Sequence, residues 1–330
     1  MRVVYCLPAG GGWHPITHMV RLLAELLDAE LMTVAVSRPG NAWRRFAGLG
    51  PRRRGRETCL VVAAEPRHLN ILLQGDYWRR GYAHTAGWVI DSFWVDRIPA
   101  AARHRDHFDQ LFVADKEVVG LWEDATGVPV RWLPWGSDVL RLGSGDGDRP
   151  VDLHRLGRQP QSWEDDEETR RACEAAGIRF EGRPPMRDDA TANQAALMGG
   201  LARAKFVLAF SNAVSPASYT HPTRDYLTGR WTDSLASGVV VAGIAPQAAA
   251  ARELLWPNAT LELSTTDRAR GIEQIVAAAR SWDPELARDN HLQALRRLDW
   301  RWRFQELAGA LEVQSEKLEV ELELLASATA

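Results

Sequence analysis

The sequence has 330 residues, of which 45% are hydrophobic and 25% charged, the usage of a globular protein rather than a disordered one. This length exceeds one ordinary core and predicts two domains of ~150 residues each. A formal net charge of −3 argues against a general nucleic-acid binder. Its three cysteines are far apart and include no Cys-x-x-Cys pair, which predicts a reducing compartment, no disulfide framework and no structural zinc site.

No apolar run approaches the ~18–20 residues that a membrane helix needs. The first eight residues have the character of a buried strand, without the apolar stretch and cleavage site of an export signal. We therefore expect a cytoplasmic protein with no membrane span.

Residues 1–140 alternate short apolar strands with helices, which predicts an α/β domain with a parallel sheet covered on both faces. The expected helices are 16–27 and 116–126, the second closed by Gly127. The expected strands are 3–7, 31–36, 59–63, 70–73, 86–90, 110–113 and 130–133.

A linker rich in glycine and aspartate, 141–150, precedes a second α/β domain at 151–305 and a C-terminal helix at 306–330. The expected strands of this half are 151–156, 178–181, 206–210 and 239–244. Its expected helices are 163–176, 191–204, 248–255, 268–279 and 284–307, with a helical turn region at 224–236. The fold class is thus α/β, with two similar domains in tandem.

Gly10, Gly11 and Gly12 stand between the first strand and the first helix, where backbone N–H groups can approach an anion. Their spacing matches neither the dinucleotide fingerprint nor the nucleoside-triphosphate loop, and a plain tight turn is the alternative. His14 follows this loop and is a candidate base or hydrogen-bond donor to a ligand. His18, one turn later, is expected to pack; no third metal ligand is evident, so no metal site is predicted.

Asp91 follows a predicted strand, at the rim where catalytic groups lie in doubly wound sheets. The alternative for Asp91 is a helix cap or an ion pair with Arg97. Arg158 follows Gly157 at the end of the first strand of the second half, where it could clamp a diphosphate in a bidentate manner or lie on the surface.

Two carboxylates, Asp225 and Asp233, stand eight positions apart and precede a glycine and a valine-rich strand. If a helix begins near Gly229, Asp233 would face the same cleft as Asp225. A carboxylate there can hold a vicinal diol, such as the hydroxyls of ribose, with two hydrogen bonds.

This segment resembles that of group-one glycosyltransferases with two facing Rossmann-like domains, the GT-B fold, and more narrowly their spore-maturation-protein-like (CgeB-like) branch. The family carries two acids with seven residues between them, then Ala-x-Gly and a buried strand, and Asp225, Asp233 and Gly238 match this pattern. Arg230, three residues before the second acid, fits the narrower branch. Trp88 with Asp91, the segment 108–115 and Gly157 with Arg158 agree in order, so the resemblance touches most of residues 1–305.

The resemblance implies a glycosyltransferase that moves a sugar from a nucleoside-diphosphate sugar to an acceptor hydroxyl in the interdomain cleft, with retention and without a metal. No cofactor is expected beyond this co-substrate, and the acceptor would be a sugar, a small molecule or a glycan precursor. Asp91 and His14 would orient or deprotonate the acceptor hydroxyl. The donor-binding candidates are Gly11, Gly12, Arg158, Arg224, Asp225, Arg230 and Asp233.

The chain departs from the family pattern at three places. Both acids are aspartate where glutamate is usual, and Val240 stands where proline is common. No lysine follows Arg158 closely, so Arg224, Arg230 or Arg183 would supply the second positive charge. Two alternatives therefore stand beside the transferase. One is a non-catalytic nucleotide-binding or scaffold relative, whose C-terminal leucines would pair two chains, and the other is a nucleotide-sugar epimerase.

Overall fold

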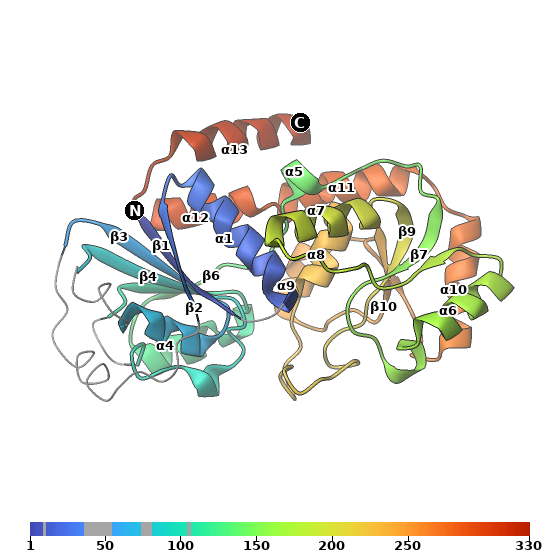
Figure 1. Ribbon diagram of the computed structural model, residues 1–330, viewed down its shortest axis with the longest axis horizontal. Coiled ribbons are helices and arrows are strands. Elements are labelled where there is room, and N and C mark those ends of the chain that lie inside the picture. The colour runs from blue at the N-terminus through green and yellow to red at the C-terminus, as the bar shows by residue number, and fades with distance from the viewer. Residues whose placement is uncertain (9–10, 36–54, 74–80, 104–106) are drawn as a thin grey trace. The chain divides into compact units, whose positions relative to one another are not determined.

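The computed structural model divides into two compact units (Figure 1). The first unit comprises residues 1–134 and 303–322, and the second comprises 135–302 and 323–330. The predicted linker 141–150 is part of the second unit in this division. The structure describes residues 1–8, 11–35, 55–73, 81–103 and 107–330.

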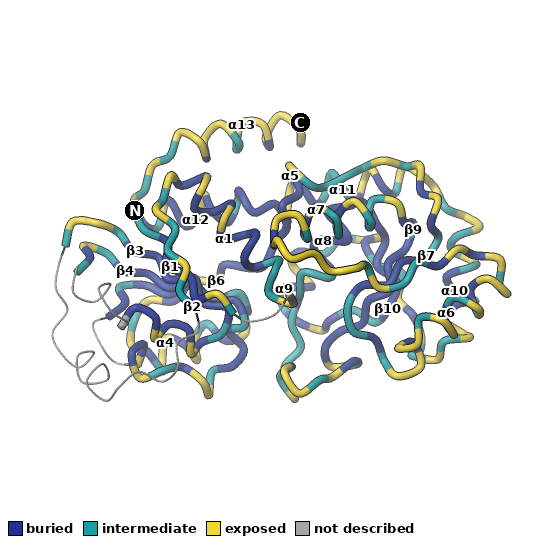
Figure 2. The backbone as a smooth tube through the Cα atoms, in the orientation of Figure 1, coloured by how far each residue is buried: buried dark blue, intermediate teal, exposed yellow. Residues whose placement is uncertain are grey.

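The first unit contains a six-stranded parallel sheet with the order β2-β1-β3-β4-β5-β6. Its inner strands are buried along almost their whole length, as Figure 2 shows for β1, β3 and β4. Helices that cover both faces require such continuous apolar strands. The strands are β1 (Arg2–Leu7), β2 (Glu30–Ala35), β3 (Thr58–Ala63), β4 (His84–Val89), β5 (Gln110–Val113) and β6 (Val130–Trp132).

The helices of the first unit agree with the predicted ones at 16–27 and 116–126, and Gly127 closes the latter in the left-handed conformation with φ +71°. The predicted strand at 70–73 is wrong, because these residues lie in a 3-10 helix that begins at Pro66. Ile71 and Leu72 face the core in this helix. Their apolar side chains therefore indicate burial but do not distinguish a strand from a helix. The helices are η1 (Gly11–Trp13), α1 (His14–Leu26), η2 (Pro66–Leu73), η3 (Val95–Arg97), η4 (Lys116–Val118) and α4 (Val119–Thr126).

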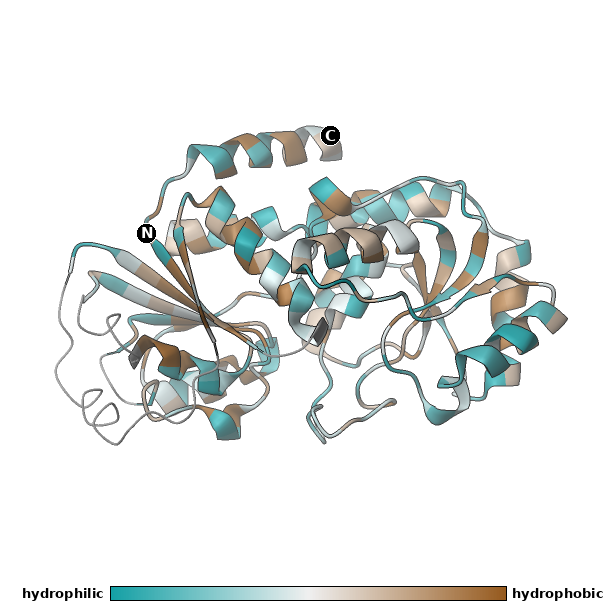
Figure 3. Ribbon diagram, in the orientation of Figure 1, coloured by the Kyte–Doolittle hydropathy of each residue, from teal (hydrophilic) through white to brown (hydrophobic). Residues whose placement is uncertain are grey.

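The second unit contains a five-stranded parallel sheet with the order β11-β10-β9-β7-β8. Hydrophobic residues dominate β9, as they dominate β1 of the first sheet (Figure 3). Two parallel α/β units confirm the predicted fold class, although the sequence did not predict the three-residue β11. The strands are β7 (Val151–Arg155), β8 (Phe180–Glu181), β9 (Ala204–Leu208), β10 (Val240–Gly243) and β11 (Thr260–Glu262).

Half of the helices in the described part of the chain lie wholly in the second unit, and the last two, α12 and α13, each have residues in both units. None of the helices in the described part of the chain combines the length and apolar character that a bilayer crossing requires. The helices are α5 (Val139–Leu142), η5 (Gln161–Trp163), α6 (Asp166–Ala175), α7 (Ala190–Leu201), α8 (Gly229–Ala236), α9 (Ala249–Leu254), α10 (Arg268–Arg280), α11 (Glu285–Arg297), α12 (Trp300–Ala310) and α13 (Glu316–Thr329).

The single helix predicted at 284–307 is wrong, because the helix is interrupted between α11 and α12. The single C-terminal helix predicted at 306–330 is wrong as well, because these residues are divided between the end of α12 and α13. At the break the carbonyl of Leu298 accepts from the Ser137 amide (2.9 Å), and the Ser137 carbonyl accepts from the Trp300 amide (3.0 Å). Buried Arg301 donates to Asp138 (2.6 Å) and to Asp299 (3.2 Å), which holds the segment before α5 against this break. A buried charge is stable only with such partners, so this ion cluster fixes the break.

Candidate functional site

Two arginines converge on one amide at the carboxyl end of the second sheet. The side-chain oxygen of Asn212 accepts from Arg158 and from Arg230, each at 2.8 Å. Arg230 also donates to the backbone carbonyl of Arg158 (3.1 Å). The three residues come from three segments far apart in the sequence and form one positively charged cluster, the Arg158–Asn212–Arg230 cluster.

The sheet topology explains how these residues meet. Strands β7 and β9 pair in parallel, with Arg155 beside Leu208, so the segments that follow them leave the sheet side by side. Arg158 follows the first strand and Asn212 the second, while Arg230 lies in the first turn of α8. Ligands of open α/β sheets bind at this edge.

Neither arginine of the cluster has a carboxylate partner among the described residues; the acceptors that hold them are amide, hydroxyl and backbone oxygens. Burial lowers the pKa of Arg230 to about 10, and the neighbouring positive charge of Arg158 adds to the effect. No carboxylate accepts a hydrogen bond from these two partly buried cations, and Asp225 acts on Arg230 only as a neighbouring negative charge, so an anionic ligand would stabilise the pair. The cluster is therefore suited to a phosphate or diphosphate.

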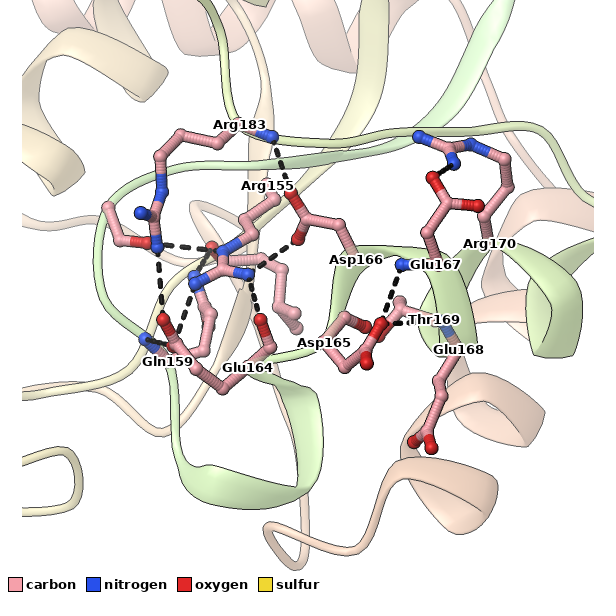
Figure 4. Close-up of polar contacts among 12 residues, drawn as sticks. Arg155, Gln159, Glu164, Asp165, Asp166, Glu167, Glu168, Thr169, Arg170 and Arg183 are labelled. Carbon is pink, nitrogen blue, oxygen red and sulfur yellow. Dashed lines mark hydrogen bonds and ion pairs between the residues drawn. The ribbon is translucent and has the colours of Figure 1, made fainter.

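Two other arginines of the second unit, Arg155 and Arg183, pair with carboxylates of the protein (Figure 4). Arg155 is buried and pairs with Glu164 (2.7 Å) and Asp166. Arg183, a sequence candidate for the second positive charge, pairs with Glu164 (3.1 Å), and its amide donates to Asp166. Arg230 and not Arg183 is thus the arginine that the structure places beside Arg158.

The two predicted acids lie on one segment but hold different parts of the second unit. Asp225 accepts from the amide of Gln247 (3.0 Å). Asp233 is 3% exposed, and its Oδ1 accepts from the hydroxyl of Ser137 (2.7 Å). The amide of Arg224 donates to the imidazole of His221 (3.1 Å). Asp233 thus has a protein partner in Ser137. Its binding of a diol stays a prediction.

The predicted helical turn region 224–236 is helical only from Gly229, where α8 begins, and the first turn of α8 is tightly enclosed. A Cβ on Gly229 would lie 3.0 Å from the indole nitrogen of Trp135 and 3.5 Å from Asp233 Oδ2. The indole N–H of Trp135 is buried and has no hydrogen-bond partner among the described residues. Only glycine fits here without a shift, and the chain brings a donor, a carboxylate and the helix N-terminus together.

In the first unit Asp91 follows β4 and lies beside the residues that follow β3. Its amide donates to the carbonyl of Ala64 (2.9 Å), which places Asp91 next to Glu65. Burial, with a smaller contribution from the charge of Glu65, raises the pKa of Asp91 to about 7. The amide of Glu65 donates to His68, whose own pKa burial lowers to about 4. Asp91 can therefore exchange a proton near neutral pH.

The glycine loop leads directly into helical structure. Gly11 and Gly12 belong to η1, while Gly10 lies outside the described residues. Gly12 is exposed, and a Cβ there would meet nothing within 4 Å, so the space beside it is open. His14 begins α1, and its Nδ1 is buried with no partner among the described residues.

Sequence reasoning missed Asn212, Ser137 and Glu65. Asn212 and Glu65 each follow a strand of a parallel sheet, which was a usable signal. Ser137 lies in a segment whose proline and glycine indicate only the end of a strand, so no sequence pattern marked it as functional.

Comparison with solved structures confirms the GT-B fold. The chain superposes on Alr3699/HepE of Anabaena, solved with UDP, with a TM-score of 0.54, 11% identity and coverage of 95% of this chain and 100% of the other. A glycosyltransferase of Rickettsia africae gives a TM-score of 0.52, 8% identity and coverage of 94% and 97%. No family model matches the sequence, and no curated protein does. The narrower CgeB-like branch stays a prediction.

Proposed function

We propose that this protein is a glycosyltransferase that takes a sugar from a nucleoside diphosphate and transfers it to an acceptor hydroxyl. The observation that carries the proposal is the Arg158–Asn212–Arg230 cluster, two cations held at a sheet edge with no carboxylate partner in the described chain. The likeness to HepE, which was solved with UDP, and to the Rickettsia glycosyltransferase agrees with this ligand class.

The chemistry of the leaving group fits the cluster. When the bond between sugar and diphosphate breaks, negative charge grows on the diphosphate oxygens. Fixed positive groups lower the energy of that state most when they are already oriented, and this kind of stabilisation is often the largest contribution to catalysis. Because Arg158 and Arg230 supply two positive charges, we propose that transfer proceeds without a metal ion.

The spacing along α8 supports the placement of the nucleoside. Arg230 and Asp233 are three residues apart in this helix, so their side chains point to the same face. In a nucleoside diphosphate the diphosphate is bonded directly to ribose. We assign the diphosphate to Arg230 and the ribose to Asp233. Asp225 and Arg224 would contact the donor sugar. The assignment of retention rests on the spacing of Asp225 and Asp233.

The first unit supplies the candidate for proton transfer. A base is most effective when its pKa lies near the working pH, and burial raises the pKa of Asp91 to about 7. We propose that Asp91 receives the proton of the acceptor hydroxyl, with His14 and the turn at Gly11 and Gly12 close to the same end of the sheet as orienting groups.

Thermal shift with a panel of nucleosides, nucleoside monophosphates, nucleoside diphosphates and diphosphate sugars tests the donor class, because a ligand selective for the native state raises the melting temperature. A rise with one diphosphate and its sugars supports the proposal, and absence of any rise contradicts it. Release of the diphosphate that requires an added acceptor identifies a transferase. Binding without turnover indicates a non-catalytic relative, and conversion of the donor without acceptor indicates an epimerase.

A further inference from the structure

Asn212 occupies the centre of the cluster but carries no charge. It is 4% exposed, and its side-chain oxygen accepts from both guanidinium groups at 2.8 Å. An amide nitrogen cannot accept these two bonds, so the geometry itself identifies the atom as oxygen. The amide therefore aligns two cations on a single point.

The remaining contacts of the two guanidinium groups are also neutral. Arg158 donates to the carbonyl of Ser215 and to the hydroxyl of Tyr219, the latter at 2.8 Å. Arg230 donates to the carbonyl of Arg158. Each guanidinium carries five N–H donors, so each keeps donors beyond those used in these contacts. The protein thus fixes the position of both cations without cancelling their charge.

We propose that Asn212 is a positioning residue that presents Arg158 and Arg230 as a pair to the two phosphates of a diphosphate, and that its neutrality is what makes the pair a diphosphate site. This inference rests on the proposed function and adds the residue that sets the site's charge. A carboxylate at the same place would align the arginines equally well but would supply internally the negative charge that the ligand brings.

The test is Asn212→Asp, which keeps the side chain's shape and adds one negative charge. We expect its affinity for UDP and for inorganic pyrophosphate to fall at least about tenfold, as loss of one charge-assisted interaction implies. We also expect its melting temperature without ligand to stay at or above that of the parent protein, because two cations gain a partner. A side chain with a merely structural role would not lower affinity while stability is kept.

Asn258→Asp is the charge-matched control. Asn258 is exposed in the same unit and shortly precedes β11, at the amino end of the sheet, so its substitution adds the same charge at the edge opposite the cluster. We expect its affinities to stay within twofold of those of the parent protein. Asn212→Ala, which removes the shared acceptor, should lose both affinity and melting temperature, and it provides a second readout if Asn212→Asp does not fold.

UDP and pyrophosphate affinities of Asn212→Asp within twofold of the parent values would overturn the inference, as would unchanged affinities in a folded Asn212→Ala. The ratio of UDP affinity to UMP affinity should be smaller in Asn212→Asp than in the parent protein. An unchanged ratio would also contradict the inference. Failure of the proposed function looks different: the parent protein would bind pyrophosphate through the cluster but no nucleoside diphosphate. In that case the comparison of pyrophosphate binding alone still tests Asn212.

Discussion

The hydroxyl of Ser137 donates a 2.7 Å hydrogen bond to Oδ1 of Asp233, and both side chains are buried. The hydroxyl of Thr232, the preceding residue of α8, donates to the carbonyl of Gly136 at 2.8 Å. These two bonds join the helix that carries Arg230 to the segment before α5. A substitution of Asp233 that weakens nucleotide binding would therefore have two explanations, a missing contact with ribose or a displaced helix. An experiment must separate them.

Asp233→Asn and Ser137→Ala make that separation. If Asp233 binds ribose, Asp233→Asn should weaken UDP binding by about 1.5–3 kcal/mol, the value of a hydrogen bond to a charged group. Ser137→Ala should cost about 1–3 kcal/mol of unfolding free energy, because it removes a hydrogen bond to a buried carboxylate, yet keep UDP affinity. Calorimetric titration and urea denaturation of both variants provide the readouts. Equal affinity losses in the two would assign Asp233 a structural role.

Arg158→Ala and Arg230→Ala should each weaken UDP binding by about tenfold to a hundredfold and leave uridine binding unchanged, because only the diphosphate contacts these cations. Arg183→Ala is the matched control, since Arg183 already pairs with Glu164 and lies more than half exposed. Isothermal titration with UDP and uridine measures both effects. Parallel losses for nucleoside and diphosphate would contradict the assignment.

The raised pKa of Asp91 predicts a specific dependence of stability on pH. Its folded-state pKa of about 7 exceeds the ordinary value of 3.8, so the native state holds the proton more tightly than the unfolded chain does. The contribution is fully present below the ordinary pKa and is lost as the pH rises through 7. Asp91→Asn removes this dependence, so the variant should gain stability relative to the parent as the pH is raised from 4 to about 8.

Urea denaturation across that range provides the measurement. Glu65→Gln is the companion variant, because the charge of Glu65 contributes to the raised pKa of Asp91, and its removal should move the midpoint of the effect to lower pH. A constant difference in stability between parent and Asp91→Asn at every pH would show that Asp91 titrates at its ordinary value.

Gly157 adopts the left-handed conformation with φ +69°, and a Cβ there would lie 2.7 Å from Cδ of Arg230. Gly157→Ala should therefore lower stability by about 1–2 kcal/mol and also reduce UDP affinity, because the methyl displaces Arg230. Gly177 has φ +78° with nothing within 4 Å of its Cβ position, so Gly177→Ala should share the stability loss only. Melting curves with and without UDP compare the two, and unchanged UDP affinity in Gly157→Ala would contradict the contact.

Local patterns predicted the fold well where one element carries its own signals. The start of α8 at Gly229 and the end of α4 at Gly127 follow from glycine and helix periodicity. The strand at 70–73 failed because a short apolar run marks burial in a strand or a helix alike. The break before α12 depends on Ser137, more than a hundred residues away, and no local pattern records such a partner.

The candidate site shows the same limit. Arg158, Arg230 and Asp233 were predicted individually, from glycine turns and acid spacing. Their partners could not be, because Asn212 and Ser137 acquire meaning only when β7 is known to lie beside β9 and the segment before α5 beside α8. Likewise the raised pKa of Asp91 depends on which strand is its neighbour.

The division of the chain has a practical consequence for fragment expression. The polypeptide passes from one unit to the other after residues 134, 302 and 322, and α12 and α13 each contribute residues to both. A gene fragment that stops at 134 lacks the helical segment 303–322 that completes its unit, and one that starts at 135 carries that segment without the sheet it belongs to. Neither half of the molecule can therefore be cloned whole as one uninterrupted stretch of codons.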